Sequence, residues 1–346
     1  MILLFCLQLL LIHKSWVVFI YAITISVESV LIEFLTTTFL EVTPIMLSAI
    51  SITLAGIMLL LVALFLMRRK EIATLLLKSW KNLSLASFFL AAGIFAWYDS
   101  INRIGASKEV LIAGPLEIVI IVVLARVFLN EKLNRIQVTG IVLALIGFFI
   151  SIVSDIDIDV LDSIQMVITP QLLSTLITFG DVEAILSAFG FGVGVLFLTK
   201  LVSLHSSIEV AGASMLISGL ILVGFMVGFS DESLQLSLVA KHSLFKQPQM
   251  NTTIIILALF SLLPFIGSLS YSTGLSRIGA SITATIGSSS ILITIIIQIM
   301  LRELGVKSNL PENIFIAVVG GVIGFLGIYI IHIHDGSMSV NLRKNK

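Results

Sequence analysis

The sequence predicts an all-α polytopic membrane protein in which ten transmembrane helices form two inverted repeats of five. The 346-residue chain has a mean hydropathy of +1.15, with 58% hydrophobic and only 12% charged residues, whereas soluble domains carry about 25% charged residues. Apolar runs long enough to cross a bilayer recur along the chain. The pentapeptide Arg-Ile-Gly-Ala-Ser occurs twice, at 103–107 and again at 277–281. Most of the chain therefore belongs in lipid, and its halves look related.

The predicted helices follow from the length that a bilayer requires, which is roughly 20 mainly apolar residues. The runs in the first half are 16–35, 43–67, 84–102, 107–129 and 136–153. Those in the second half are 182–201, 208–229, 252–274, 279–301 and 313–333. Residues 1–12 are apolar but too short to cross, and they lack the basic start and cleavage site of a signal peptide. We expect them to be an N-terminal extension of the first helix or an upstream mis-start.

The two halves also resemble each other in their last helices, where Gly140, Ala144 and Gly147 recur 180 positions later as Gly320, Gly324 and Gly327. A unit of five helices crosses the bilayer an odd number of times, so its second copy must enter from the opposite side. We expect a first repeat at 16–153, an acidic extracytoplasmic linker at 154–181 and a second repeat at 182–333. Inverted repeats are typical of secondary transporters, whose substrate site lies near the midplane between the halves.

The distribution of Lys and Arg predicts the orientation in the membrane. A cytoplasmic N-terminus places 14 of the 20 basic residues on the cytoplasmic side, and the opposite orientation places 6 there. Because cytoplasmic loops are enriched in these residues, both termini are expected inside the cell, with the protein in the plasma membrane. The aspartates between 155 and 181 suit a solvated outer linker. They lack the glycine hinge and bidentate glutamate of a calcium loop.

A family resemblance rests on the fourth and fifth predicted helices and their counterparts. Pro115 and Leu116, the exit Leu-Asn-Glu-Lys-Leu at 129–133 and the glycine-rich helix that follows resemble the EamA repeat of the drug/metabolite transporter superfamily. The second copy keeps Leu-Arg-Glu-Leu at 301–304 but has three serines at 288–290 in place of the Pro-Leu neighbourhood. The resemblance implies a ten-helix carrier with cytoplasmic termini. Such carriers move small polar or amphipathic metabolites such as amino acids, often outward, by alternating access.

Glycines in the apolar runs predict close helix packing. Gly140 with Ala144, and Gly320 with Gly324, place small residues on one helix face, which lets neighbouring backbones approach in a membrane. Packing within each five-helix bundle and packing between protomers of a homo-oligomer both fit this pattern. The glycines within 190–194 lack the Lys-Ser/Thr of a phosphate loop. Close packing or a flexible pivot is the better interpretation of that segment.

The ninth predicted helix carries a polar stripe, consisting of Thr283, Gly287, Ser290, Thr294 and Gln298. At 3.6 residues per turn these positions share one face of an otherwise isoleucine-rich helix. Polar side chains at membrane depth are costly unless they face a cavity or a partner, so this face is expected to line a cavity. Hydroxyls that bond back to their own helix are the alternative.

The eighth predicted helix carries a companion stripe, consisting of Ser261, Pro264, Ser268 and Ser272, with Tyr271 alongside. Pro264 permits a kink where the backbone lines a water-filled space. Trp97 and Tyr98 lie at the corresponding place in the third helix. They fit either a binding platform or an interfacial aromatic belt.

Two carboxylates, Glu28 and Glu117, fall inside predicted spans. Glu28 shares a stripe with Tyr21 and Thr24. Either glutamate could bind a substrate cation or carry a coupling proton, and an interhelical hydrogen bond is the alternative for both. Other acidic residues lie near helix ends and are expected to reach water, namely Glu33, Asp99, Glu109, Glu183 and Glu209. Glu131 and Glu303 are expected to cap helices or form salt bridges at the membrane boundary.

The residues expected to bind substrate are Glu28, Trp97, Tyr98, Glu117, Ser268, Tyr271, Ser290, Thr294 and Gln298. We expect no catalytic residues, cofactor or metal, because the chain has a single cysteine and lacks zinc and ATP-binding motifs. The expected partners are a small-molecule metabolite, the lipid bilayer and, for coupling, a proton. Clustered basic residues typical of nucleic-acid binding are missing. A passive facilitator or channel is the alternative function, and an intramembrane enzyme is a more distant one.

Overall fold

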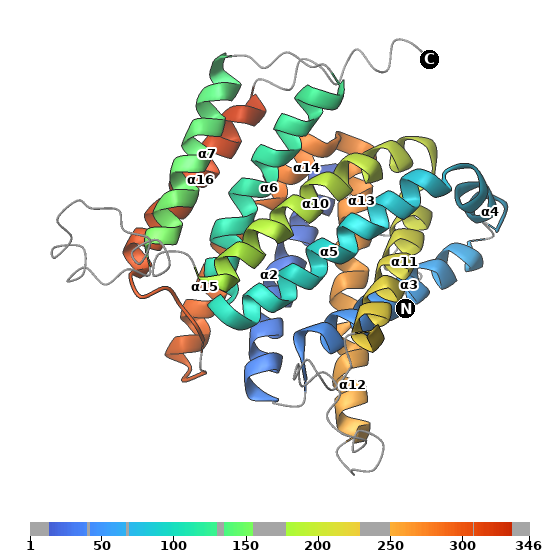
Figure 1. The fold of residues 1–346 in the computed structure, drawn as a ribbon, viewed down its shortest axis with the longest axis horizontal. Coiled ribbons are helices and arrows are strands. Elements are labelled where there is room, and N and C mark those ends of the chain that lie inside the picture. The colour runs from blue at the N-terminus through green and yellow to red at the C-terminus, as the bar shows by residue number, and fades with distance from the viewer. Residues whose placement is uncertain are drawn as a thin grey trace.

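The computed structural model describes residues 14–39, 42–66, 69–129, 135–154, 178–228, 250–306 and 308–333, and every regular element within these ranges is a helix (Figure 1). The prediction of an all-helical protein is confirmed for these residues. Residues 1–13, most of the acidic linker, Glu131 and the basic C-terminus lie outside the described residues.

The helices of the first half are α2 (Lys14–Thr38), α3 (Pro44–Phe65), α4 (Arg69–Lys78), α5 (Trp80–Ile104), α6 (Ala106–Leu129) and α7 (Arg135–Val153). Those of the second half are α10 (Phe179–Leu204), α11 (Ser207–Gly228), α12 (Met250–Phe260), α13 (Leu262–Ile278), α14 (Ala280–Gly287), α15 (Ser290–Glu303) and α16 (Ile314–Ile333). α12 and α13 together match one predicted run, as do α14 and α15. With these pairs each counted as one, the helices begin and end within four residues of the predicted runs, and only the short α4 was not predicted.

The described helices include six segments of 22 to 26 residues that are long and apolar enough to cross a membrane. They correspond to α2, α3, α5, α10, α11 and most of the α12–α13 pair. Shorter apolar stretches occur in α7 and α16, at Val138–Ile152 and Ile314–Ile330. The protein is therefore an integral, multi-pass membrane protein.

Two predicted helices are interrupted. Pro264 lacks the N–H that would bond to the carbonyl of Phe260, four residues earlier, and the helix breaks at Ser261, between α12 and α13. The second break falls between α14 and α15, within the three consecutive serines at 288–290. Here Ser289 donates its hydroxyl to the carbonyl of Ile286 at 2.7 Å, and its backbone N–H bonds to the same carbonyl at 3.1 Å. The tighter three-residue turn interrupts the α-helical pattern.

The repeated pentapeptide forms the same turn twice. Gly105 ends α5 with φ 82°, and Gly279 ends α13 with φ 85°. In both turns the glycine N–H closes the helix on the carbonyl four residues earlier, in Ile101 and in Leu275. Positive φ favours glycine because it has no Cβ. The next helix then begins at Ala106 or Ala280.

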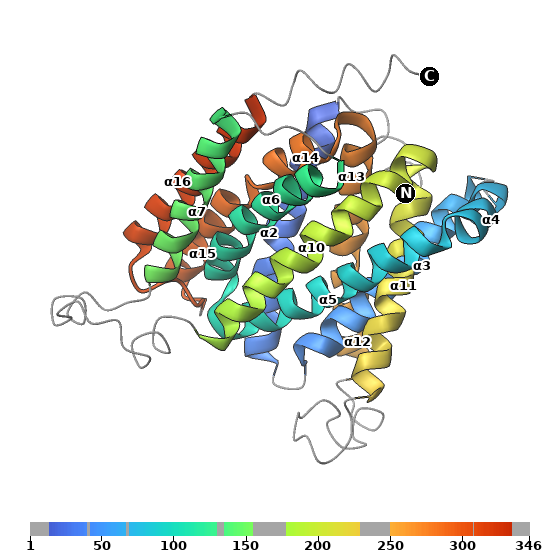
Figure 2. The same ribbon diagram turned by 45° about the horizontal axis from the view of Figure 1, so that its top comes forward.

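The helices pair across the two halves of the chain. The most extensive contacts join α5 to α10, α7 to α16 and α3 to α11, followed equally by α2 to α13 and α6 to α10. The first three pairs run side by side in both views (Figures 1 and 2). α2 also contacts α14, α15, α5 and α6. It therefore occupies the centre of the bundle.

Small residues make the close pairs possible. A Cβ at Gly147 of α7 would lie within 3.0 Å of the α16 backbone at Gly324, and one at Gly327 would meet the α7 backbone at Ala144. The predicted small-residue faces therefore pack between the two halves of one chain, rather than inside one five-helix bundle. Gly190 of α10 packs similarly on Gly93 of α5, so close packing explains the glycines of that segment.

Candidate functional site

A cavity of about 160 Å³ lies inside the bundle. It is lined by α2, α5, α6 and α10 together with α13, α14 and the first residue of α15, with smaller contributions from α3 and α11. Pockets for drug-sized ligands usually measure roughly 300–1,000 Å³, so this cavity suits a small solute.

Carboxylates dominate the polar chemistry of the cavity. Glu28 of α2 and Glu109 and Glu117 of α6 line it, whereas no Lys, Arg or His occurs among the described residues of its wall. Glu28 accepts a hydrogen bond from the Tyr98 hydroxyl at 2.8 Å. Glu109 accepts a longer one from Ser187 at 3.5 Å. Apolar side chains supply most of the remaining wall.

Aromatic rings stand on two sides of the cavity. Tyr21 of α2 and Tyr271 of α13 have ring centroids 4.7 Å apart at an angle of 47°. Trp97 of α5 and Phe191 of α10 form an edge-to-face pair at 5.9 Å. All four line the cavity. Because Trp97 is only 6% exposed, it belongs to the interior and not to an interfacial belt.

The residues expected to bind substrate divide into two groups. Those that line the cavity are Glu28, Trp97, Glu117, Ser268, Tyr271 and Ser290. Those that lie outside its lining are Tyr98, Thr294 and Gln298, all three fully buried. Tyr98 holds Glu28 in place from behind.

The polar stripe of the ninth helix reaches the cavity only at the break between α14 and α15. Gly287 and Ser290 line it, whereas Thr283 donates to the Gly279 carbonyl at 2.7 Å, which is the back-bonding alternative. Thr294 and Gln298 lie one and two turns beyond Ser290, about 6 and 12 Å along a helix axis. Neither residue lines the cavity, and both side chains are fully buried among other helices. The expectation that the whole stripe lines the cavity was therefore wrong.

The companion stripe of the eighth helix fits better. Pro264, Ser268 and Ser272 of α13 line the cavity. Ser261 does not, because it lies at the break before α13 and donates to the carbonyl of Ala258 at 2.6 Å. On α13 the lining runs from Pro264 to Ser272, whereas the ninth-helix stripe lines the cavity only at Gly287 and Ser290.

Gln298 belongs to a buried polar cluster that we call the α2–α15 junction, formed by Glu33, Ala106, Ser107, Gln298 and Asn309. The Glu33 carboxylate accepts hydrogen bonds from the backbone N–H groups of Ala106, at 2.8 Å, and Asn309, and from the Gln298 amide. The Gln298 oxygen in turn accepts from the N–H of Ser107, at 2.9 Å, and from its hydroxyl. The junction ties α2 and α15 to the α5–α6 turn and to the segment before α16.

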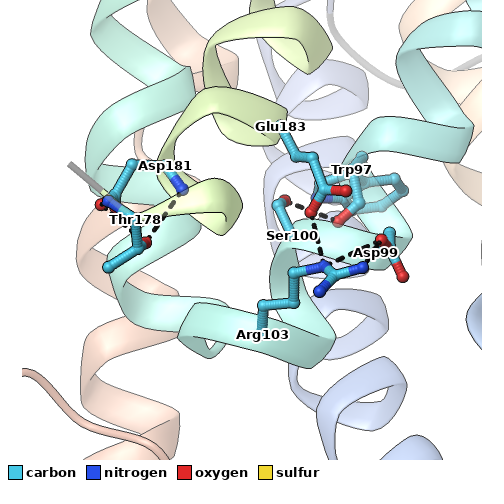
Figure 3. Close-up of polar contacts among 7 residues, drawn as sticks. All are labelled: Trp97, Asp99, Ser100, Arg103, Thr178, Asp181 and Glu183. Atoms are coloured by element: carbon cyan, nitrogen blue, oxygen red, sulfur yellow. Dashed lines mark hydrogen bonds and ion pairs between the residues drawn. The ribbon is translucent and has the colours of Figure 1, made fainter. Parts of the chain in front are cut away.

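A second polar cluster joins the α5–α6 turn to the start of α10 (Figure 3). Arg103 lies between Asp99, at 2.9 Å, and Glu183, at 3.0 Å. Lys108 contacts Asp181 at 3.0 Å, with both side chains almost fully buried. Asp181 was expected in the outer linker, but it forms a capping box with Thr178 in the first turn of α10.

The expectation that acidic residues near helix ends reach water was wrong for most of them. Glu33 and Glu109 are 2% exposed, Glu183 is 6% exposed and Glu209 is fully buried. Neighbouring turns cover these helix ends, and a buried charge must then find a partner. Sequence reasoning consequently missed Glu109 as a cavity residue. Its position eight residues before Glu117 on the same helix was the available signal.

Comparisons with known proteins agree with this architecture. Residues 13–153 and 178–333 match the EamA-like transporter family. The chain belongs to this family, which is part of the drug/metabolite transporter superfamily. A solved structure titled "Crystal structure of protein" superposes with a TM-score of 0.60 at 16% identity, covering 92% of this chain and 98% of that one, which shows the fold alone. No curated protein is detectably similar to this chain.

The described residues of this EamA-like protein contain no cluster of side chains suited to a metal ion. No group of three or more His, Cys, Asp or Glu residues there is arranged to hold an ion. The carboxylates of the cavity instead stand apart on its wall, facing aromatic and apolar side chains. This arrangement can hold a small organic solute.

Proposed function

We propose that this EamA-like protein is a secondary transporter that exports small polar or amphipathic metabolites by alternating access. The cavity carries the proposal, because both family-matched regions build its wall. α2, α5 and α6 come from the first region, and α10, α13 and α14 come from the second. Rocking one region against the other would open such a cavity first to one side and then to the other.

The proposal includes ten membrane crossings arranged as two inverted repeats, at 16–153 and 182–333. The pattern of helix pairs supports it. In the proposed repeats α2 and α10 are the first helices, and α5 and α13 are the third. The third helix of each repeat therefore packs on the first helix of the other, as α5 on α10 and α13 on α2, and both contacts are extensive. The identical turns at Gly105 and Gly279 are a second equivalence.

The proposed orientation has both termini in the cytoplasm and the 154–181 linker outside, in the plasma membrane. It rests on the placement of 14 of the 20 basic residues on the cytoplasmic side. With this orientation the α2–α15 junction and the Arg103 cluster both lie toward the outer face. They would hold that side of the cavity closed in the observed conformation. Outward transport would require these contacts to separate.

Counterflow in proteoliposomes tests transport, with two matched glycine variants. Gly267 lines the cavity on α13, and a Cβ there would meet only side-chain atoms of Thr24 and Tyr21 at 3.7 and 3.9 Å. Gly267→Leu should therefore fill the cavity and reduce uptake at least tenfold while the protein still folds. Gly224 of α11 is exposed and has nothing within 4 Å of its Cβ position. Gly224→Leu should transport like the parent protein.

The assay loads vesicles with an unlabelled mixture of amino acids, amines and organic acids, and follows uptake of each labelled compound. Saturable uptake that is stimulated by the internal solute indicates a carrier. Uptake that is linear in concentration and indifferent to internal solute would instead indicate a passive facilitator or channel. Chemical conversion of a solute by the purified protein would favour an intramembrane enzyme. Equal transport by the two leucine variants would remove the cavity from the transport path.

A further inference from the structure

Two polar groups of the cavity have no protein partner. Glu28 bonds to Tyr98 and Glu109 bonds to Ser187, but Glu117 makes no hydrogen bond or ion pair within the part of the chain that the structure describes. The hydroxyl of Tyr271 is buried and equally without a partner. Buried polar groups are nearly always satisfied in folded proteins. Two unsatisfied groups that line the same cavity are therefore available to bind a ligand there.

The two unsatisfied groups face the same cavity. Glu117 of α6 lines it together with Tyr271 of α13 and Tyr21 of α2. The rings are 4.7 Å apart and inclined at 47°, so together they form two sides of a corner. A cation beside an aromatic face gains about 0.5–2 kcal/mol from the ring quadrupole. The cavity thus combines the Glu117 carboxylate with two aromatic rings of negative face potential.

The surroundings disfavour anions and hard metal ions. An anion would meet three carboxylates and, among the described wall residues, no basic side chain. A calcium-like ion requires six to eight oxygen ligands, whereas the wall here is mainly aliphatic and aromatic, with residues such as Ile25, Leu90 and Val195. An organic cation with a hydrocarbon body suits both the carboxylates and the apolar wall of the cavity.

We propose that the cavity binds a small organic ammonium ion, with the charged nitrogen between Glu117, Tyr21 and Tyr271. The nitrogen donates a hydrogen bond to the Glu117 carboxylate and another to the Tyr271 hydroxyl oxygen. The hydrocarbon part lies against the apolar wall. This inference names the substrate class of the proposed transporter, and it rests on that function only in taking the bound solute to be the transported one.

Calorimetry on the purified full-length protein in lipid nanodiscs tests the inference with three probes of similar size. 2-Phenylethylammonium is the cation, 2-phenylethanol is its neutral counterpart and phenylacetate is the anion. We expect the cation to bind at least tenfold more tightly than either of the others, which corresponds to about 1.4 kcal/mol. Equal binding of the three probes, or preference for the anion, would overturn the inference on the parent protein alone.

Two variants locate the site, each with a control of the same chemistry. Glu117→Gln should weaken binding of the cation at least tenfold and leave the weak binding of 2-phenylethanol unchanged. Its control is Glu303→Gln at the end of α15, where the side chain is exposed and lies outside the cavity lining. Tyr271→Phe should weaken cation binding severalfold through loss of one acceptor. Its control is Tyr329→Phe on α16, where the side chain is 49% exposed.

The results separate this inference from the proposed function. Cation binding without counterflow would contradict the proposed transport function and support the proposed ammonium site. Counterflow of neutral or anionic solutes without cation binding would support the proposed transport function and contradict the proposed ammonium site. Tight cation binding that survives both Glu117→Gln and Tyr271→Phe would place the cation elsewhere and overturn the assignment. Should Glu117→Gln fail to fold, the probe series and Tyr271→Phe decide the question by themselves.

Discussion

Individual side chains hold the carboxylates of the cavity in place, and Tyr98 is the clearest case. Its hydroxyl donates to Glu28 at 2.8 Å and lies 3.4 Å from Ser51. Tyr98→Phe keeps the ring but leaves buried Glu28 without this donor, which should lower the free energy of unfolding by about 1–3 kcal/mol. Chemical or thermal unfolding in detergent measures the change. In the double variant with Glu28→Gln the losses should be less than additive, because both changes remove the same contact.

Glu28 and Glu117 can also be separated by their roles in transport. Glu117 is unsatisfied and Glu28 is bonded to Tyr98, so only Glu117→Gln should weaken substrate binding strongly, and it should do so at every pH. Transport in vesicles with and without an imposed pH gradient measures this. If Glu117 instead carries a coupling proton, the variant should lose proton-driven accumulation and retain exchange of substrate. Two variants that both accumulate substrate like the parent would assign the glutamates to packing.

The helix pairs depend on contacts that leave no room for a methyl group. Gly147→Ala would place a Cβ within 3.0 Å of the α16 backbone at Gly324, so the α7–α16 pair must separate. Overpacking of this kind costs about 1–3 kcal/mol, which should appear as a lower unfolding midpoint. Gly224→Ala is the matched control, because its Cβ position is empty. Alanine there should instead raise stability slightly through its better helix propensity. Equal effects would mean that this close approach is unimportant.

The break in the ninth helix predicts different outcomes for two leucine substitutions. Ser290→Leu at the cavity should reduce transport at least tenfold with a nearly unchanged yield of folded protein. Gln298→Leu removes hydrogen bonds from Glu33 and Ser107 in the α2–α15 junction, so folded yield and unfolding midpoint should both fall. Ile291→Leu is the control for both. Loss of transport without loss of stability in Gln298→Leu would place Gln298 on the substrate path.

The topology of the whole molecule is tested by reporters fused at three positions. A reporter after Lys346 and one at position 75, in α4, should both report cytoplasm, while one at position 160 should report the outer side. The expectation follows from the basic-residue distribution and from the odd number of crossings in each repeat. Finding positions 75 and 160 on the same side would end the inverted-repeat proposal. It would leave the family membership and the cavity unchanged.

Much of the fold could be predicted from the sequence because a membrane imposes a simple rule on each segment. Crossing helices must be apolar and about 20 residues long, so composition alone located their ends to within four residues. The repeated pentapeptide and the glycine spacing likewise identified equivalent positions, since a turn with positive φ needs glycine in both copies. The break before Pro264 was also foreseeable from the missing N–H.

The tertiary structure alone decided which polar residues meet. Periodicity places Ser290 and Gln298 on one helix face, but it says nothing about where a cavity ends or which helix covers the next turn. The structure puts Ser290 at the cavity and Gln298 against Glu33. It also brings Glu109 into the cavity wall from a helix end that composition assigned to water. Burial of a polar side chain depends on segments distant in the chain, and so only packing could decide it.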